Sequence, residues 1–121
     1  MKSILVVDDN KMLCRMACDI LHQEGYRAIP ASSVEEALEA FEQQSFDLVV
    51  TNFHLPGVGG AELARAIRDR APGFPIIMTG FEPVECEHVT LFLPRQFLFP
   101  SLIEKIGACL AELEGPPLAR R

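Results

Sequence analysis

Acidic, amide, hydroxyl and basic side chains each follow or end a short apolar run in this chain of 121 residues. Asp8 and Asp9 come directly after the first run, Asn52 follows a second, Thr79 ends a third, and Arg95 follows a fourth. Carboxylates bind divalent cations, and a guanidinium group is suited to bidentate pairing with a carboxylate. These five residues can act together only if the fold brings them to one place.

Short β-branched runs that alternate with amphipathic stretches predict the elements that carry these residues. The predicted strands are Ser3–Val7, Tyr26–Pro30, Asp47–Thr51, Pro75–Thr79 and Leu91–Leu93, and the predicted helices are Lys11–Glu24, a helix that begins at the capping box of Ser33, Ala61–Arg70 and Ser101–Glu114. The alternation predicts an α/β fold, a flavodoxin-like doubly wound sheet of five parallel strands in the order 2-1-3-4-5. Ligands of such folds bind beyond the carboxyl ends of the strands, where the five polar residues lie.

Composition limits the class of protein. The chain is 49% hydrophobic and 23% charged, with a net charge of −6. This balance predicts one globular domain over residues 1–114, and we expect residues 115–121 to be a tail or the start of a linker. The negative charge argues against direct binding of nucleic acid. Because no apolar run is long enough for a membrane span or a signal peptide, we expect a cytoplasmic protein without membrane association.

The four cysteines show neither zinc nor haem spacing. Cys14 and Cys18 lie four residues apart, so they face the same side if their segment is helical. We expect them to be small, buried, reduced hydrophobic residues. Cys86 and His88 lack the companions that a metal site needs.

The ordered set of motifs resembles the receiver domains of two-component response regulators over about residues 3–113. Asp8 and Asp9 are similar to the family's acidic pair, and residues 47–57 are similar to the third strand and its loop, which in the family carries the phosphorylated aspartate. Thr79 resembles the family's hydroxyl residue, and Arg95 stands where the family has a lysine. The resemblance implies the same fold and a site where an aspartate accepts a phosphoryl group with the help of a divalent metal.

Asn52 stands where the resemblance places the phosphorylated aspartate. A carboxamide offers no usable nucleophile and only a carbonyl oxygen to a metal. The ligands that the resemblance implies are then Asp8, Asp9 and the main-chain carbonyl of His54. Loss of one of three anions predicts weak or absent Mg²⁺ binding, and no cofactor is required.

Arg95 is the second departure from the family. Its planar guanidinium suits bidentate pairing with a carboxylate, whereas lysine is a point charge. Two orientations are open at this stage. In one, Arg95 pairs with Asp8 or Asp9 as an internal substitute for a metal ion, and in the other it faces solvent.

The third departure is the short segment between Thr79 and Arg95, which predicts a shortened or degenerate fourth helix. Phe92 occupies the position of the family's switch-like aromatic residue, and an ordinary core phenylalanine is the favoured alternative. Apolar residues near the shortened helix are a candidate surface for a protein partner. They are Phe81, Val84, Val89 and Leu91.

These departures predict a pseudo-receiver that is not phosphorylated at the usual position and acts by binding a signalling protein or an output domain. Homodimer formation is a further expectation. Asn52, Thr79 and Arg95 are interpreted as a degenerate phosphorylation site, so neither a catalytic residue nor an enzyme activity is predicted. The alternative is a metal-dependent phosphoryl acceptor that uses Asp8 or Asp9. A flavodoxin-like ligand binder or enzyme is disfavoured, because no glycine-rich phosphate loop follows the first strand.

Overall fold

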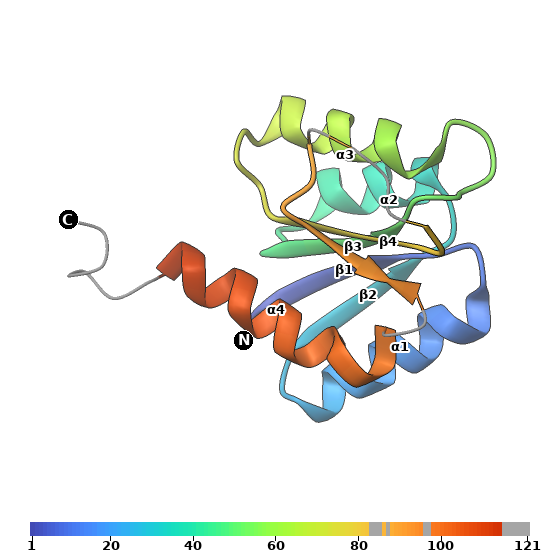
Figure 1. The fold of residues 1–121 in the computed structure, drawn as a ribbon. Helices are drawn as coiled ribbons and strands as arrows, with labels where there is room; N and C mark the ends of the chain where they lie inside the picture. Colours follow the sequence, from blue (N-terminus) through green and yellow to red (C-terminus); the bar gives the residue numbers. More distant parts are fainter. Residues whose placement is uncertain (83–85, 87, 96–97, 115–121) are drawn as a thin grey trace.

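A single parallel sheet organises the molecule, for which a computed structural model describes residues 1–82, 86, 88–95 and 98–114. Its strands lie in the order β2-β1-β3-β4-β5 (Figure 1). Their bounds are β1 Ser3–Val7, β2 Arg27–Ala31, β3 Leu48–Asn52, β4 Ile76–Gly80 and β5 Leu91–Pro94. The predicted strand order and fold class are therefore confirmed.

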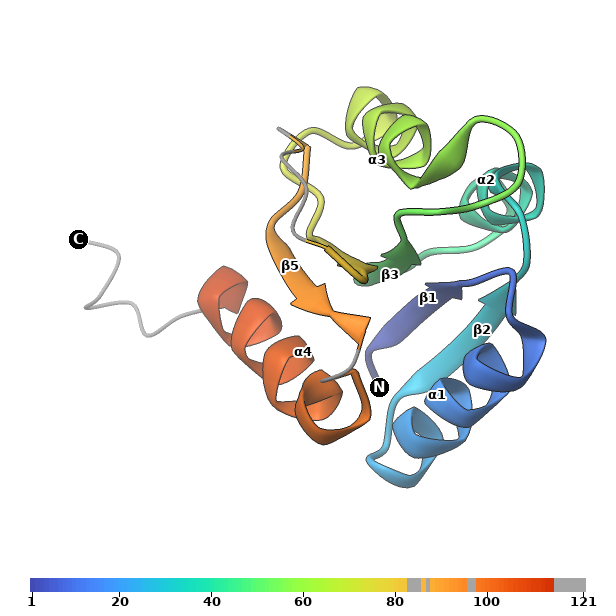
Figure 2. The same ribbon diagram turned by 45° about the vertical axis from the view of Figure 1, so that its right-hand side comes forward.

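Helices cover both faces of the sheet, as Figures 1 and 2 show. Helices α1 and α4 lie on one face, and α2 and α3 lie on the other. Their bounds are α1 Lys11–Gln23, α2 Val34–Gln43, α3 Gly59–Arg70 and α4 Leu98–Glu114. Between β4 and β5, the described residues 81, 82, 86 and 88–90 form bends and turns without a helix, in agreement with the predicted loss of a regular fourth helix.

Alternation along the strands divides the core into two clusters, because successive side chains of a strand point to opposite faces. Ile4 and Val6 of β1 pack toward α1 and α4, whereas Leu5 and Val7 pack toward α2 and α3. The three central strands are nearly closed to solvent on both sides. This burial fixes the register of the strands, since a slip by one residue would exchange the two clusters.

Several element boundaries differ from the prediction by one to three residues. Strand β2 begins at Arg27 because the N–H of Tyr26 donates to the Leu21 carbonyl at 3.0 Å and closes the end of α1. Helix α4 begins at Leu98 rather than Ser101, with Pro100 in its first turn, where a missing N–H carries no cost.

Ser33 caps α2 as predicted, and the N–H of Glu36 donates to its hydroxyl oxygen at 3.1 Å. The return contact differs from a regular capping box. The Glu36 carboxylate accepts from the N–H and the hydroxyl of Ser32, at 3.2 and 2.9 Å, rather than from Ser33.

Candidate functional site

The parallel sheet brings the predicted polar residues to one edge. Asp8 follows β1, Asn52 ends β3, and Thr79 lies in β4 in register with Asn52. All three residues are buried, whereas Asp9 is exposed. Arg95 follows β5, the strand next to β4. Four of the five residues therefore converge, and Asp9 is the exposed one.

Arg95 forms a buried ion pair with Asp8. Its Nη1 lies 2.7 Å from Oδ2 of the carboxylate, and its Nη2 lies 3.5 Å from Oδ1. The two side chains are only 9% and 7% exposed. Oδ1 of Asp8 also accepts the N–H of Asn10 at 2.9 Å. Both carboxylate oxygens thus have donors, and of the two orientations open for Arg95 the structure has the pairing with Asp8.

An exposed aromatic ring lies against the guanidinium. The ring centre of Phe81 is 5.5 Å from Cζ of Arg95, within the range of a cation–π interaction. Phe81 itself is 73% exposed. Sequence reasoning placed Phe81 on a partner surface and missed this contact, which no local spacing indicates. The ring shields Arg95 and helps to hold it over Asp8.

The Asn52 carboxamide forms a hydrogen bond within the loop that follows β3. Its Nδ2 donates to the His54 carbonyl at 2.7 Å, and this donor must be the nitrogen, because a carbonyl oxygen can only accept. Oδ1 of Asn52 is buried and has no hydrogen-bond partner among the described residues. A neutral amide therefore closes the loop after β3.

Backbone contacts hold this loop against β3 and β4. The N–H of Phe53 donates to the Thr79 carbonyl at 2.7 Å, and the N–H of Gly60 donates to the Phe53 carbonyl at 2.8 Å. A Cβ atom on Gly60 would collide with the main-chain carbonyl oxygen of Asn52. Only glycine therefore permits this close approach of the two backbone segments. The loop thus places the His54 carbonyl within reach of Asn52.

These residues do not fit the Mg²⁺ site that the sequence led us to test. The Asp8 oxygens already accept from Arg95 and Asn10, and the His54 carbonyl accepts from Asn52. Within the described part of the chain, no three His, Cys, Asp or Glu side chains could hold a metal together. Mg²⁺ prefers free carboxylates and retained waters. At this site the positive charge beside Asp8 comes from Arg95 instead.

The described candidate partner residues pack in different directions, and their role as a partner surface stays a prediction. Val89 packs against the core under α2 and α3, and Leu91 packs against the opposite core under α1 and α4. Val84 lies outside the described residues. Among the three described candidates, Phe81 is largely exposed, whereas Val89 and Leu91 are half-buried.

Phe92 is half-buried and packs against the core under α2 and α3. Its ring would lie 3.3 Å from a Cβ atom on Gly80, so the ring covers the end of β4. The geometry agrees with a core phenylalanine, and a switching role for Phe92 stays a prediction.

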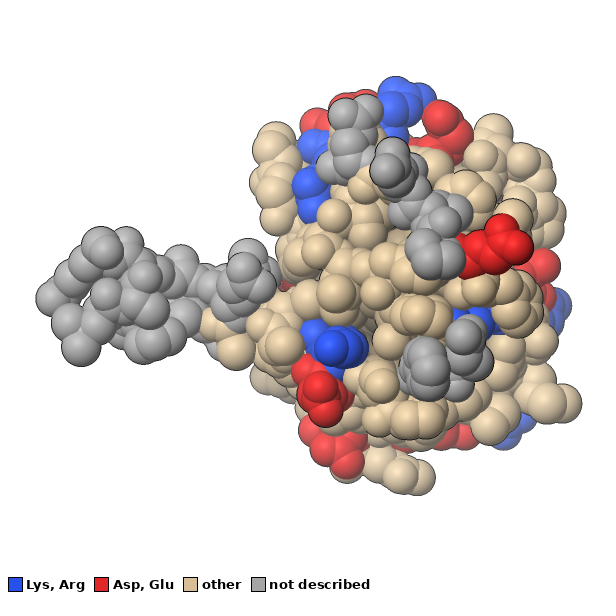
Figure 3. All heavy atoms as spheres, in the orientation of Figure 1, with Lys and Arg blue, Asp and Glu red and all other residues tan. Residues whose placement is uncertain are grey.

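The molecular surface carries charges of both signs. On the face in Figure 3, Lys and Arg side chains lie among Asp and Glu side chains, and the described residues of this face form no broad basic patch. None of the helices that the structure describes is long and apolar enough to cross a membrane.

Comparison with known sequences points to one family. A family model described as "Response regulator receiver domain" matches residues 4–90. The transcriptional activator ExaE of Pseudomonas putida is 36% identical over 109 residues, which cover 88% of this chain and 45% of ExaE. The virulence sensor protein BvgS of Bordetella pertussis is 46% identical over 76 residues, which cover 59% of this chain and 6% of BvgS. The chain thus spans less than half the length of these relatives.

Solved structures show the same architecture. The response regulator TrrA of Thermotoga maritima, solved in complex with Mg²⁺-BeF, is 31% identical, with a TM-score of 0.83 over 91% of this chain and 100% of TrrA. A CheY-like receiver domain protein of Methanospirillum hungatei is 28% identical, with a TM-score of 0.86 over 94% of this chain and 97% of its own.

Proposed function

Because this chain belongs to the response regulator receiver domain family, we propose that it is a pseudo-receiver, which takes no phosphoryl group at position 52. It acts in two-component signalling by binding another protein. The observation that carries the proposal is the buried ion pair between Arg95 and Asp8, which engages the carboxylate that a metal ion would need.

Asn52 supports the proposal in two ways. Its amide nitrogen is a poor nucleophile, because the lone pair is delocalised into the carbonyl. The same amide donates to the His54 carbonyl, so an aspartate here would put a carboxylate oxygen against a carbonyl oxygen. The loop is thus built for the neutral side chain.

The alternative acceptors are less suitable. Asp8 is buried, and its oxygens already accept from Arg95 and Asn10. Asp9 is exposed, whereas Thr79, which would have to bind a phosphoryl oxygen, is buried. Phosphorylation of Asp8 or Asp9 is therefore the result that would overturn the proposal.

We propose a signalling protein or an output domain as the partner. TrrA, which has this fold and is 31% identical, has been solved in complex with the histidine kinase ThkA. On this chain, exposed Phe81 over Arg95 is the described remnant of the expected partner surface. A cytoplasmic location, homodimer formation and the absence of enzyme activity belong to the same proposal.

Intact-mass measurement with Mg²⁺ and acetyl phosphate tests it. We expect no phosphoryl adduct on the natural chain. We expect little on Asn52→Asp, because Arg95 still forms its ion pair with the Asp8 carboxylate in this variant. The double variant Asn52→Asp/Arg95→Lys is expected to gain the adduct, because it supplies an acceptor carboxylate and because lysine cannot pair with both Asp8 oxygens as the guanidinium does. The matched control, Asn52→Asp/Arg65→Lys, changes an exposed arginine and is expected to behave like Asn52→Asp. An adduct on the natural chain, mapped to Asp8 or Asp9, would contradict the proposal.

A further inference from the structure

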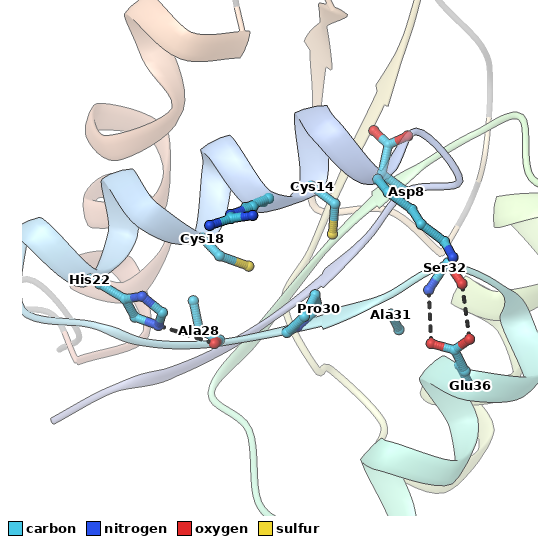
Figure 4. A pocket seen from close by; sticks show the side chains of 11 residues that line it. Asp8, Cys14, Cys18, His22, Ala28, Pro30, Ala31, Ser32 and Glu36 are labelled. Atoms are coloured by element: carbon cyan, nitrogen blue, oxygen red, sulfur yellow. Dashed lines mark hydrogen bonds between the residues drawn. The ribbon is translucent and has the colours of Figure 1, made fainter.

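A pocket of about 410 Å³ lies between α1 and β2 and has Asp8 in its lining (Figure 4). Its floor is apolar and includes Ala28, Pro30 and Ala31. Two thiols, Cys14 and Cys18, line its wall, and the proposed function uses neither.

The two cysteines lie one turn apart on α1. Figure 4 shows both sulfur atoms on the side of the helix that faces β2. Their residues are only 4% and 5% exposed, and both thiols are free. The Cys14 thiol donates to the Val6 carbonyl at 3.4 Å. Interaction with the Cys18 side chain lowers the pKa of Cys14, and the same interaction raises the pKa of Cys18, so the two thiols act as one unit.

A disulfide does not suit this arrangement. Helical residues four apart have Cβ atoms about 5–6 Å apart, while a disulfide needs about 3.5–4.5 Å. Formation of a disulfide between Cys14 and Cys18 would therefore require the backbone of α1 to unwind within the core. A single atom placed between the sulfurs would leave the helix intact.

The number of available protein ligands limits which metal ion could bind between the two sulfur atoms. Thiolates favour Cu(I), zinc and iron–sulfur clusters. Zinc in structural sites takes four ligands and iron–sulfur clusters take four cysteines. The described residues hold no group of three metal-ligating side chains. His22, one turn beyond Cys18, donates Nε2 to the Ala28 carbonyl at 3.2 Å. Only an ion that accepts two ligands remains.

We propose that Cys14 and Cys18 bind one Cu(I) ion as a two-coordinate bis-thiolate at the wall of this pocket. Two S–H bonds break, two S–Cu bonds form, and two protons pass to solvent while copper stays monovalent. The resulting group carries one negative charge, and Lys11 and Arg15 line the same pocket.

Of the other charged groups at the pocket, Asp8 opposes a thiolate at Cys14, because its negative charge acts to raise the Cys14 pKa, but both acidic side chains are engaged elsewhere. The Asp8 carboxylate is paired with Arg95, and the Glu36 carboxylate accepts two hydrogen bonds from Ser32. Cys14 also lies in the first turn of α1, where the helix dipole favours a thiolate.

The test offers Cu(I) to the reduced full chain without oxygen, as its coloured complex with bathocuproine disulfonate. Loss of colour reports transfer, and we expect one copper per chain. Cys14→Ser and Cys18→Ser should each weaken binding by at least about 100-fold, more than the loss of an outer-shell partner. Cys86→Ser keeps the same cysteine count as these variants, and with His22→Ala it should bind as the natural chain does.

Circular dichroism checks that each serine variant is folded. If one is not, X-ray absorption on the copper-loaded natural chain is decisive, with two sulfur neighbours and no nitrogen expected. Three results would overturn the proposal: full affinity in Cys14→Ser, one copper shared by two chains, or a nitrogen neighbour in the absorption spectrum. The variant Asn52→Asp should bind copper unchanged, because this inference does not rest on the proposed function.

Discussion

Two ion pairs of equal length behave differently because of where they lie. Nη1 of Arg95 is 2.7 Å from Asp8, and Nη2 of Arg65 is 2.7 Å from Glu62. The first pair is 9% and 7% exposed at the carboxyl end of the sheet, while the second is 54% and 49% exposed on α3. The N···O distance alone therefore does not distinguish a buried ion pair at the candidate site from an exposed one on a helix surface.

Burial sets the consequence of losing one partner. Removing one charge from a buried pair leaves the other uncompensated, at a cost of about 3–5 kcal/mol. An exposed pair is hydrated and screened, and contributes about 0–1 kcal/mol. At the carboxyl end of the sheet, Arg95 thus provides the countercharge for the buried side chain of Asp8.

The largest expected effect comes from Arg95→Met, which removes the guanidinium and keeps most of the apolar stem. We expect the free energy of unfolding to fall by about 3 kcal/mol, because Asp8 is left buried without a countercharge. The matched change Arg65→Met should cost less than about 0.5 kcal/mol. Urea unfolding of both variants measures the difference, and equal losses would contradict the comparison.

The double variant Asp8→Asn/Arg95→Met separates the ion pair from the packing around it. Asparagine keeps an oxygen for the N–H of Asn10 and removes the buried charge. We expect most of the stability to return, to within about 1 kcal/mol of the natural chain. A double variant no more stable than Arg95→Met would show that the lost stability is due to packing.

A smaller effect is expected for Phe81→Leu, which keeps an apolar side chain but removes the ring over Arg95. A cation–π contact at an exposed site contributes about 0.5–1 kcal/mol. We therefore expect a loss of about 0.5 kcal/mol in urea unfolding. In the Arg95→Met background the same change should have no measurable effect, and an undiminished loss there would refute the contact.

The smallest effect concerns an exposed carboxylate. Hydrogen bonds from the Ser32 hydroxyl and N–H lower the pKa of Glu36. Its contribution to stability is therefore present above the unfolded pKa, about 4.3, and is lost as the pH falls through the lower folded value. Thermal melts across this range should show a slightly weaker pH dependence for Glu36→Gln, and a stronger one would reverse the assigned sign.

Local patterns were enough to predict most of the fold. The continuous apolar run Ile4–Val7 is typical of a strand buried on both faces, and the spacing of apolar residues in α1 has the period of a helix with one buried face. The cap at Ser33 was predicted because its partner is three residues away. Strand ends were less accurate where a residue such as Tyr26 bonds to the preceding helix rather than to the sheet.

The contacts of the site needed the three-dimensional structure. Arg95 is 87 residues from Asp8, and the sequence left its partner open between two aspartates and solvent. Phe81 was placed on a surface with Val89 and Leu91, although the latter two are half-buried against opposite core clusters. Side-chain types predicted which groups meet at the edge, but not which pairs form.

The most direct test of the central claim is a Mg²⁺ titration followed by NMR, using the amide signals of Asp9 and Phe53 beside the site. We expect no saturable shift in the natural chain at millimolar Mg²⁺, because the Asp8 carboxylate is engaged in the ion pair with Arg95. Asn52→Asp/Arg95→Lys should show a saturable shift, since the first change adds a carboxylate and the second replaces the bidentate guanidinium at Asp8 by a single point charge. Saturable binding to the natural chain at these concentrations would show that Arg95 does not take the place of a metal ion.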